Sequence, residues 1–173
     1  MRILMVVDSF VPDTLGGAER VVLGWSRELA SRGHEVRVLA GRVNAPPGPD
    51  EEMEGFRVRR WSSRRRTFAD GYLSAVRACA AAGRRLIGEE PPDVIHGCQG
   101  LSAYALGLAG PRAPWVYTFF APWSGELAEE ARAREEGLPA FARPLYRLGV
   151  RLEQWRVGRM ERRVLARSAV TAL

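Results

Sequence analysis

Lysine is absent from the 173-residue sequence, so its formal net charge of +6 at pH 7 is carried by arginine. Complete replacement of lysine indicates a compositional bias of the genome first, although the forked guanidinium does suit phosphate and carboxylate partners. Cysteine is scarce too. Cys79 and Cys98 lie in different predicted elements and lack the spacing of a metal site. We therefore expect free thiols in a reducing cytoplasm, and neither cysteine is a candidate nucleophile.

Long apolar runs are also missing. No stretch approaches the roughly 20 apolar residues that a helix needs to cross a bilayer. The richest stretch, residues 101–110, is interrupted by Ser102 and by glycines. The apolar run before Asp8 is too short for a signal peptide, which predicts a cytoplasmic protein. Length and composition are typical of one globular domain that folds alone.

The hydrophobic pattern alternates between short β-rich runs and helical stretches. This order predicts an α/β fold: a parallel sheet with crossover helices on both faces. We expect strands at 3–7, 35–40, 56–61, 94–97 and 114–119, and one cut short at 169–173. We expect helices from Ala18 to just before Gly33, and at 67–89, just after 97, 124–136 and 144–167. Residues 44–50 contain three prolines and a glycine, which predicts an exposed loop.

Gly16 and Gly17 lie between the first predicted strand and the first predicted helix. Glycines there let the backbone approach a ligand, and the helix dipole attracts an anion such as a phosphate. The G-x-G-x-x-G fingerprint is missing, and the second strand ends in Gly41-Arg42 rather than an acid, which disfavours NAD. No Gly-Lys-Ser/Thr follows the pair, which argues against a P-loop. A permissive structural turn is the alternative interpretation.

Several segments together resemble glycosyltransferase family 4. The opening motif is Gly16-Gly17-Ala18-Glu19-Arg20, and residues 28–36 end in Arg32-Gly33-His34-Glu35-Val36. Further matches are Pro92-Asp93-Val94-Ile95-His96, Val116-Tyr117-Thr118-Phe119, Glu161-Arg162-Arg163 and Ala169-Val170-Thr171-Ala172-Leu173. The resemblance covers essentially the whole chain.

This resemblance implies a GT-B enzyme with two Rossmann-like domains, retention of configuration, a nucleotide-sugar donor as substrate, and neither metal nor cofactor. Residues 1–173 would form the amino-terminal, acceptor-side domain. The carboxyl-terminal domain, which in the family binds the nucleotide-sugar and carries a spaced pair of glutamates, is absent from the chain. The isolated domain is therefore expected to be inactive, and no residue of it is assigned a catalytic role.

Carried over position by position, the resemblance places Gly16 and Gly17 against the donor diphosphate. It places two groups of residues at the acceptor cleft: His96, Cys98 and Gln99 after the fourth main strand, and Phe120 and Trp123 after the fifth. Cys98 and Phe120 occupy positions where the family often has histidine. This departure favours either an apolar acceptor pocket or a non-catalytic glycan- or partner-binding module. A core histidine is the alternative interpretation of His96, and Asp8 is interpreted as a loop cap.

Two clusters contain much of the arginine, six between Arg57 and Arg66 and seven between Arg143 and Arg163. If the first cluster shares a side with Trp61 and Phe68, it suits anionic lipid headgroups, as in a peripheral enzyme at the inner membrane face with a lipid-linked acceptor. A solvated face is the alternative. Glu153 and Glu161 interleave with the second cluster, which favours ion pairs on a helix over a nucleic-acid patch. We therefore expect a sugar or lipid-linked acceptor and no nucleic acid.

Overall fold

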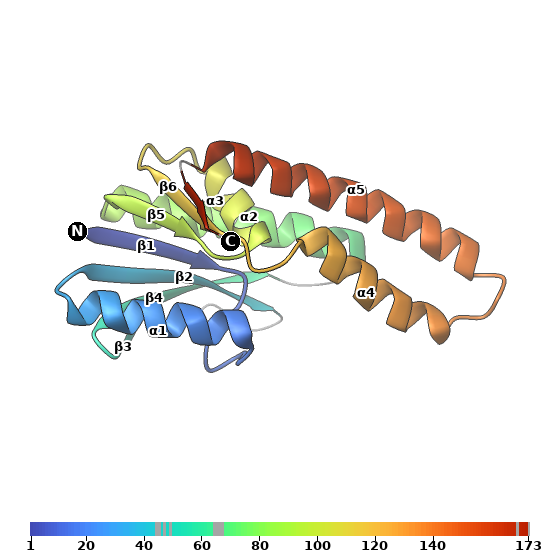
Figure 1. Cartoon of the computed structure of the whole chain (residues 1–173), viewed down its shortest axis with the longest axis horizontal. Helices are drawn as coiled ribbons and strands as arrows, with labels where there is room; N and C mark the ends of the chain where they lie inside the picture. The colour runs from blue at the N-terminus through green and yellow to red at the C-terminus, as the bar shows by residue number, and fades with distance from the viewer. Residues whose placement is uncertain (44–45, 47, 49, 64–67, 169, 173) are drawn as a thin grey trace.

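Seven strands form one sheet in the order β3-β4-β2-β1-β5-β6-β7 (Figure 1). This computed structural model describes residues 1–43, 46, 48, 50–63, 68–168 and 170–172, with the side chains of 68–72, 123, 126, 130 and 170–172 left out. The strands are β1 (Arg2–Val7), β2 (Glu35–Val43), β3 (Glu51–Met53), β4 (Phe56–Ser63), β5 (Val94–Gly97), β6 (Trp115–Thr118) and β7 (Val170–Ala172). Every pairing is parallel except that of β3 with β4.

The central strand β1 is apolar on both sides because both faces of the sheet are covered. Leu4 and Val6 point into a core with α2 and α3, whereas Met5 and Val7 point into a second core with α1. All four side chains are at most 1% exposed. A continuous apolar run is what a parallel strand buried on two faces requires.

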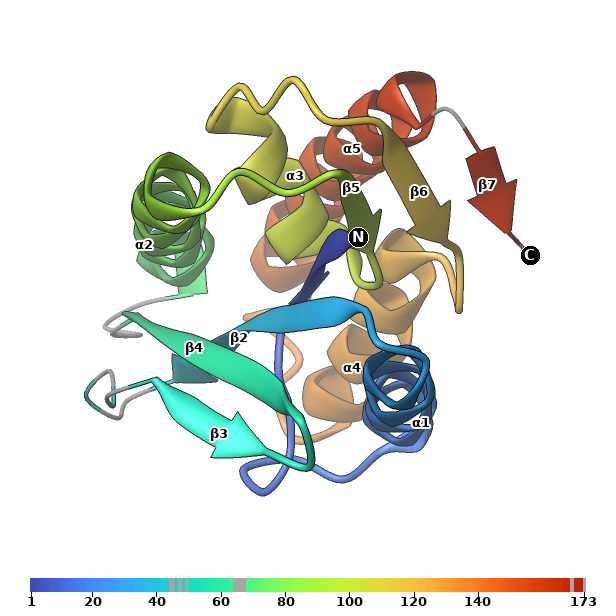
Figure 2. The same ribbon diagram turned by 90° about the vertical axis from the view of Figure 1, so that its left-hand side faces the viewer.

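Five helices accompany the sheet: α1 (Gly17–Ser31), α2 (Phe68–Glu89), α3 (Gly100–Leu108), α4 (Trp123–Glu136) and α5 (Arg143–Arg167). Helix α1 covers one face, while α2, α3 and the carboxyl-terminal part of α5 cover the other (Figure 2). Gly33 follows α1 at φ +82°, a conformation that favours glycine and ends the helix. The predicted α/β architecture is therefore confirmed.

The strands depart from the sequence-based expectation near the β2–β4 edge. Strand β2 continues to Val43 rather than ending at Ala40, because its parallel ladder with β4 extends to the pair Val43 and Ser63. Strand β3 was not predicted. It is three residues long and folds back onto β4 through a turn in which Glu54 and Gly55 have positive φ.

Parts of some predicted elements lie outside the described residues. These are positions 44, 45, 47 and 49 of the predicted loop, Thr67 at the start of the second helix, and residues 169 and 173 of the last strand. Among the residues that are described, no helix is long and apolar enough to span a membrane.

Candidate functional site

The order of the strands creates a crevice between β1 and β5. From β1 the chain continues through α1 on one face, whereas α2 and α3 pack on the other face. The loops after β1 and β5 therefore diverge, and ligands of open α/β sheets bind at such a point. A cavity of about 120 Å³ lies there. Its lining residues are Asp8, Ala18, Cys98, Gln99, Gly100, Tyr117, Phe120 and Ala121.

The buried carboxylate of Glu19 connects the two sides of this crevice. Glu19 Oε2 accepts a hydrogen bond from Gly16 N–H at 2.9 Å, and Oε1 accepts one from the Ser9 hydroxyl at 2.8 Å. Gln99 Nε2, from the β5–α3 loop, also donates to Oε1 at 3.3 Å. Gln99 Oε1 in turn accepts the Asp8 N–H at 2.6 Å. The glycine turn is therefore held against the end of β5 by a polar network.

Gly16 and Gly17 have different surroundings. A Cβ added to Gly16 would lie 2.6 Å from Glu19 Oε2, so the absence of a side chain there leaves room for the carboxylate. A Cβ added to Gly17 would meet no atom within 4 Å. The first residue of α1 is thus open to a ligand, at the helix end where the dipole favours an anion.

Asp8 caps α3 rather than its own loop. Its Oδ1 accepts a hydrogen bond from the Ser102 N–H at 2.7 Å, in the first turn of α3. Burial raises the pKa of the Asp8 carboxyl, while the bonds from Ser102 act in the opposite direction. The interpretation of Asp8 as a loop cap is therefore corrected. Its side chain joins the end of β1 to the first turn of α3.

His96 lies on β5 in an aromatic and polar cluster. Its Nε2 is 2.8 Å from Thr118 Oγ1, at the end of β6. Its ring stacks on Trp25 of α1, with centroids 5.2 Å apart, and Trp25 also stacks on Phe120 at 6.1 Å. Burial lowers the pKa of His96, so the imidazole is neutral at pH 7.

Cys98 and Gln99 follow His96 and reach the crevice differently. The Cys98 side chain is fully buried in the core on the α1 side, although it also borders the cavity. Burial raises the pKa of its thiol, which is free and neutral, as burial also does for Cys79. Gln99 instead contributes its amide to the Glu19 network.

The structure brings most of the predicted cleft residues together. Cys98, Gln99 and Phe120 line one cavity, and His96 connects to it through Trp25. Trp123 begins α4 next to these residues in the chain, and its side chain lies outside the description. Sequence reasoning missed Trp25, because its place on the apolar face of the first helix gave only a core signal.

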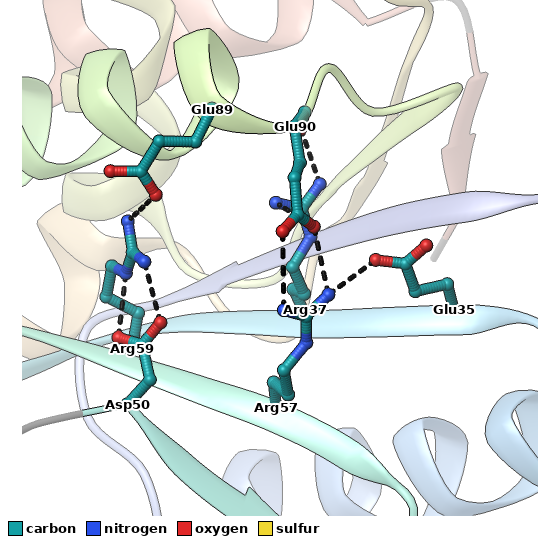
Figure 3. Close-up of polar contacts among 7 residues, drawn as sticks. All are labelled: Glu35, Arg37, Asp50, Arg57, Arg59, Glu89 and Glu90. Carbon is teal, nitrogen blue, oxygen red and sulfur yellow. Dashed lines mark hydrogen bonds and ion pairs between the residues drawn. The ribbon is translucent and has the colours of Figure 1, made fainter.

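The described part of the first arginine cluster, Arg57, Arg59 and Arg60, forms ion pairs and does not share an exposed surface with Trp61. Trp61 is 4% exposed and packs in the core with α2 and α3. Arg57 pairs with Glu35 at 2.6 Å and with Glu90 at 2.9 Å (Figure 3). The described arginines of this cluster are therefore neutralised locally, while 64–67 and the Phe68 side chain lie outside the described residues.

Neighbouring arginines complete this ion-paired region. Arg59 pairs with Asp50 and Glu89, each at 2.6 Å, and holds the pKa of Asp50 below its usual range (Figure 3). The buried Arg37 donates to the Glu90 carbonyl at 2.5 Å. These contacts join β2, β4 and the end of α2, so they are structural.

The second arginine cluster lies on α5, together with the two glutamates that interleave with it. Glu153 forms the predicted pair on the same helix, with Arg156 at 3.1 Å. Glu161 accepts a hydrogen bond from the Ser124 hydroxyl of α4 at 3.0 Å. Both glutamates are buried against neighbouring elements. Glu161 therefore fixes the start of α4, beside the crevice, to α5.

The model of Glycosyltransferase Family 4 matches residues 15–172. Sucrose-phosphate synthase from Thermosynechococcus elongatus is 17% identical at a TM-score of 0.59, over 86% of this chain and 39% of that chain. Anabaena HepE in complex with UDP and glucose is 15% identical at a TM-score of 0.44, over 79% of this chain and 36% of that chain. A structure described as trehalose-6-phosphate from E. coli bound with UDP-2-fluoro glucose is 14% identical at a TM-score of 0.47, over 70% of this chain and 33% of that chain. No curated protein matches.

The sheet order and the crevice define a Rossmann-like α/β domain of the kind found in the amino-terminal portion of GT-B glycosyltransferases. The chain belongs to glycosyltransferase family 4. It spans 39% of the sucrose-phosphate synthase chain that it matches. The family and the fold expected from the sequence are therefore confirmed.

Proposed function

We propose that residues 1–173 form the acceptor-side domain of a glycosyltransferase that transfers a sugar from a nucleotide-sugar to an acceptor with retention of configuration. The observation that carries this proposal is the open backbone at Gly17, where an added Cβ would meet nothing within 4 Å. It lies at the amino terminus of α1 and beside the crevice at the strand-order switch. Family membership supports the choice of sugar transfer over other phosphate chemistry.

The leaving diphosphate is the group that this part of the domain would stabilise. Negative charge grows on it as the bond to the sugar breaks, and oriented amides with a helix dipole favour that charge. The Glu19 network keeps the turn in one conformation before the donor arrives, so less ordering is needed on binding. We assign Gly17 to the diphosphate and Gly16 to the support of that turn.

The acceptor wall in this proposal is aromatic. Phe120 is 41% exposed and stacks on Trp25, which gives a flat apolar surface at the crevice. Such a surface suits the apolar face of a sugar ring or a lipid-linked acceptor. Neither Cys98, whose thiol is neutral, nor Phe120 supplies a base at the positions where the family often has histidine.

A carboxyl-terminal domain would complete the enzyme by binding the nucleotide and sugar and by supplying the glutamate pair. Matched structures are much longer than this chain, which supports a two-domain whole. The second candidate is a non-catalytic module that binds a glycan or a partner. The replacement of two histidine positions by Cys98 and Phe120 favours it.

The test is turnover with a panel of nucleotide-sugars, comparing residues 1–173 with the product of the full coding sequence. We expect hydrolysis or transfer from the long form alone, and Gly17→Ala should lower its kcat/KM about tenfold or more because the new methyl occupies the phosphate site. Gly24→Ala, in the same helix and equally open, is the matched control and should leave turnover unchanged. Glycan binding with no turnover from either form would establish the module instead.

A further inference from the structure

Helix α5 exposes an apolar stripe on the side opposite its buried residues. Side chains spaced by three or four residues lie on one face of a helix. The exposed apolar residues follow this spacing and continue into the preceding turn: Phe141 (87% exposed), Leu145 (76%), Leu148 (56%), Leu152 (54%) and Trp155 (58%). The buried positions Glu153, Val157 and Val164 fall on the opposite face. Single exposed leucines are ordinary, but five large apolar side chains in a row indicate a binding surface.

Arginines border this stripe. Arg151 follows Leu148 by three positions, and Arg159 follows Trp155 by four, with its guanidinium carbon 4.9 Å from the Trp155 ring centroid. Within the part of the chain that the structure describes, neither arginine forms an ion pair. The two acids of the helix, Glu153 and Glu161, are buried. The exposed charge of α5 is therefore of one sign.

We propose that this face of α5, the apolar stripe with its bordering arginines, docks on an anionic membrane surface. A helix with leucine and tryptophan on one face and arginines beside them binds in the interfacial plane, with apolar burial and attraction to anionic lipid acting together. This inference does not depend on the proposed function. It also places the membrane contact on a different surface from the ion-paired arginines of β4.

The charge of α5 favours an anionic lipid surface over a second copy of the chain as the binding partner of this face. A two-fold symmetric dimer through the stripe would bring the same patch of each copy together. Arg151 and Arg159 of one copy would then face arginines of the other, with no exposed acid of α5 to compensate. An anionic lipid surface supplies the missing charge instead.

The position of α5 gives the docking a consequence for the site. The α4–α5 pair projects past the carboxyl end of β1 (Figure 1). Glu161 of α5 binds Ser124 at the start of α4, immediately after the Phe120 loop. A membrane-bound α5 would thus hold the crevice near the lipid surface.

Flotation with vesicles tests the proposal, using residues 1–173 and phosphatidylglycerol-containing or pure phosphatidylcholine vesicles. We expect binding to the anionic vesicles only, weakened by salt. Leu148→Ser/Leu152→Ser should reduce the partition coefficient about tenfold or more, because both side chains lose apolar burial. Leu73→Ser/Leu108→Ser is the matched control, since these leucines are 54% and 53% exposed on α2 and α3. It should bind like the parent.

A charge variant distinguishes electrostatic attraction to anionic lipid from non-specific adsorption. Arg151→Glu/Arg159→Glu should reduce binding about 25-fold or more, since each basic residue near an anionic surface contributes about 1 kcal/mol. Arg77→Glu/Arg84→Glu makes the same change of net charge on exposed positions of α2 and should have a smaller effect. Absence of flotation, equal losses in both pairs, or loss of a dimer by Leu148→Ser/Leu152→Ser in light scattering would overturn the proposal.

Discussion

Glu19 Oε2 accepts a hydrogen bond from the Gly16 N–H at 2.9 Å, so the third residue of α1 caps the turn that precedes the helix. The same carboxylate also accepts hydrogen bonds from the Ser9 hydroxyl and the Gln99 side-chain amide. One buried side chain therefore ties the loop after β1 to the loop after β5. Both this carboxylate and the glycine turn that it binds therefore shape the crevice.

Replacement of Glu19 by alanine should destabilise the fold by about 1–3 kcal/mol, because it leaves three part-buried donors without their acceptor. Urea unfolding measures this change. Glu19→Gln keeps one acceptor oxygen and should cost less. Glu28→Ala removes a carboxylate of the same helix that pairs with the exposed Arg32, and it should change stability by about 0.5 kcal/mol or less. Equal effects of Glu19→Ala and Glu28→Ala would contradict the role of the network.

Gly41 allows β2 to pass the end of β1. A Cβ on Gly41 would lie 2.3 Å from the Asp8 carbonyl oxygen and 2.5 Å from the Trp61 ring, neither of which can move freely. We expect Gly41→Ala to destabilise the domain by about 1–3 kcal/mol or more. Thermal and urea unfolding both measure this loss of stability.

The control for this prediction is Gly24→Ala. Gly24 lies inside α1, where an added Cβ would meet nothing within 4 Å. Alanine is favoured over glycine in a helix by about 1 kcal/mol, so this change should raise stability. Destabilisation by both substitutions would show that the close approach at Gly41 is not the cause.

The sequence predicted the order of the main elements because each buried strand and amphipathic helix carries a local period. It missed β3, whose three residues are too short to show a period. Trp61 illustrates a related limit in the core. Strand alternation places it on the face opposite Val58, with Arg57 and Arg59, and its packing against α2 and α3 is what buries it. Local patterns therefore predicted the layers well.

The site was predictable only in part. Gly16 and Gly17 were identified by their place between a strand and a helix. The Glu19–Gln99 bond joins residues 80 positions apart, and no local pattern predicts such a contact. The stack of Trp25 on His96 and Phe120 likewise depends on tertiary packing.

His96 should make stability depend on pH. Burial lowers its pKa below the ordinary 6.5, so the unfolded chain takes up this proton first as the pH falls. The stabilisation is complete above about pH 6.5 and is lost as the pH drops through the unfolded and then the folded pKa. Urea unfolding at about pH 7.5 and 5.5 should show a smaller loss for His96→Gln than for the parent.

The other histidine provides the comparison. His34→Gln removes the other histidine, which lies between α1 and β2 and outside the Trp25 stack, and it serves as the matched control. Buried Asp8 contributes the same background to every variant. If His96→Gln keeps the full loss of stability between the two pH values, the neutral, half-buried imidazole is not its source.

Arg60 and Arg59 are neighbours on β4 that each pair with two acids, yet they should respond differently to substitution. The Arg60 side chain is fully buried and binds Glu51 at 2.9 Å, Asp13 at 3.2 Å and the Val11 carbonyl at 2.5 Å. The Arg59 side chain is 26% exposed. Arg60→Met leaves the buried Val11 carbonyl without its donor, while the part-exposed Asp13 and Glu51 keep their pairs with Arg42, so the change should cost about 1–3 kcal/mol. Arg59→Met should cost about 1 kcal/mol or less.

The two substitutions should also differ in the loop after β1. Because Arg60 binds both Val11 and Asp13, its loss should free that loop and raise amide hydrogen exchange at residues 9–16. Arg59→Met leaves those contacts in place, so exchange there should match the parent. Since the loop leads directly into the glycine turn, raised exchange with Arg60→Met alone would show that a buried ion pair on β4 holds the crevice in shape. Unchanged exchange would confine the role of Arg60 to global stability.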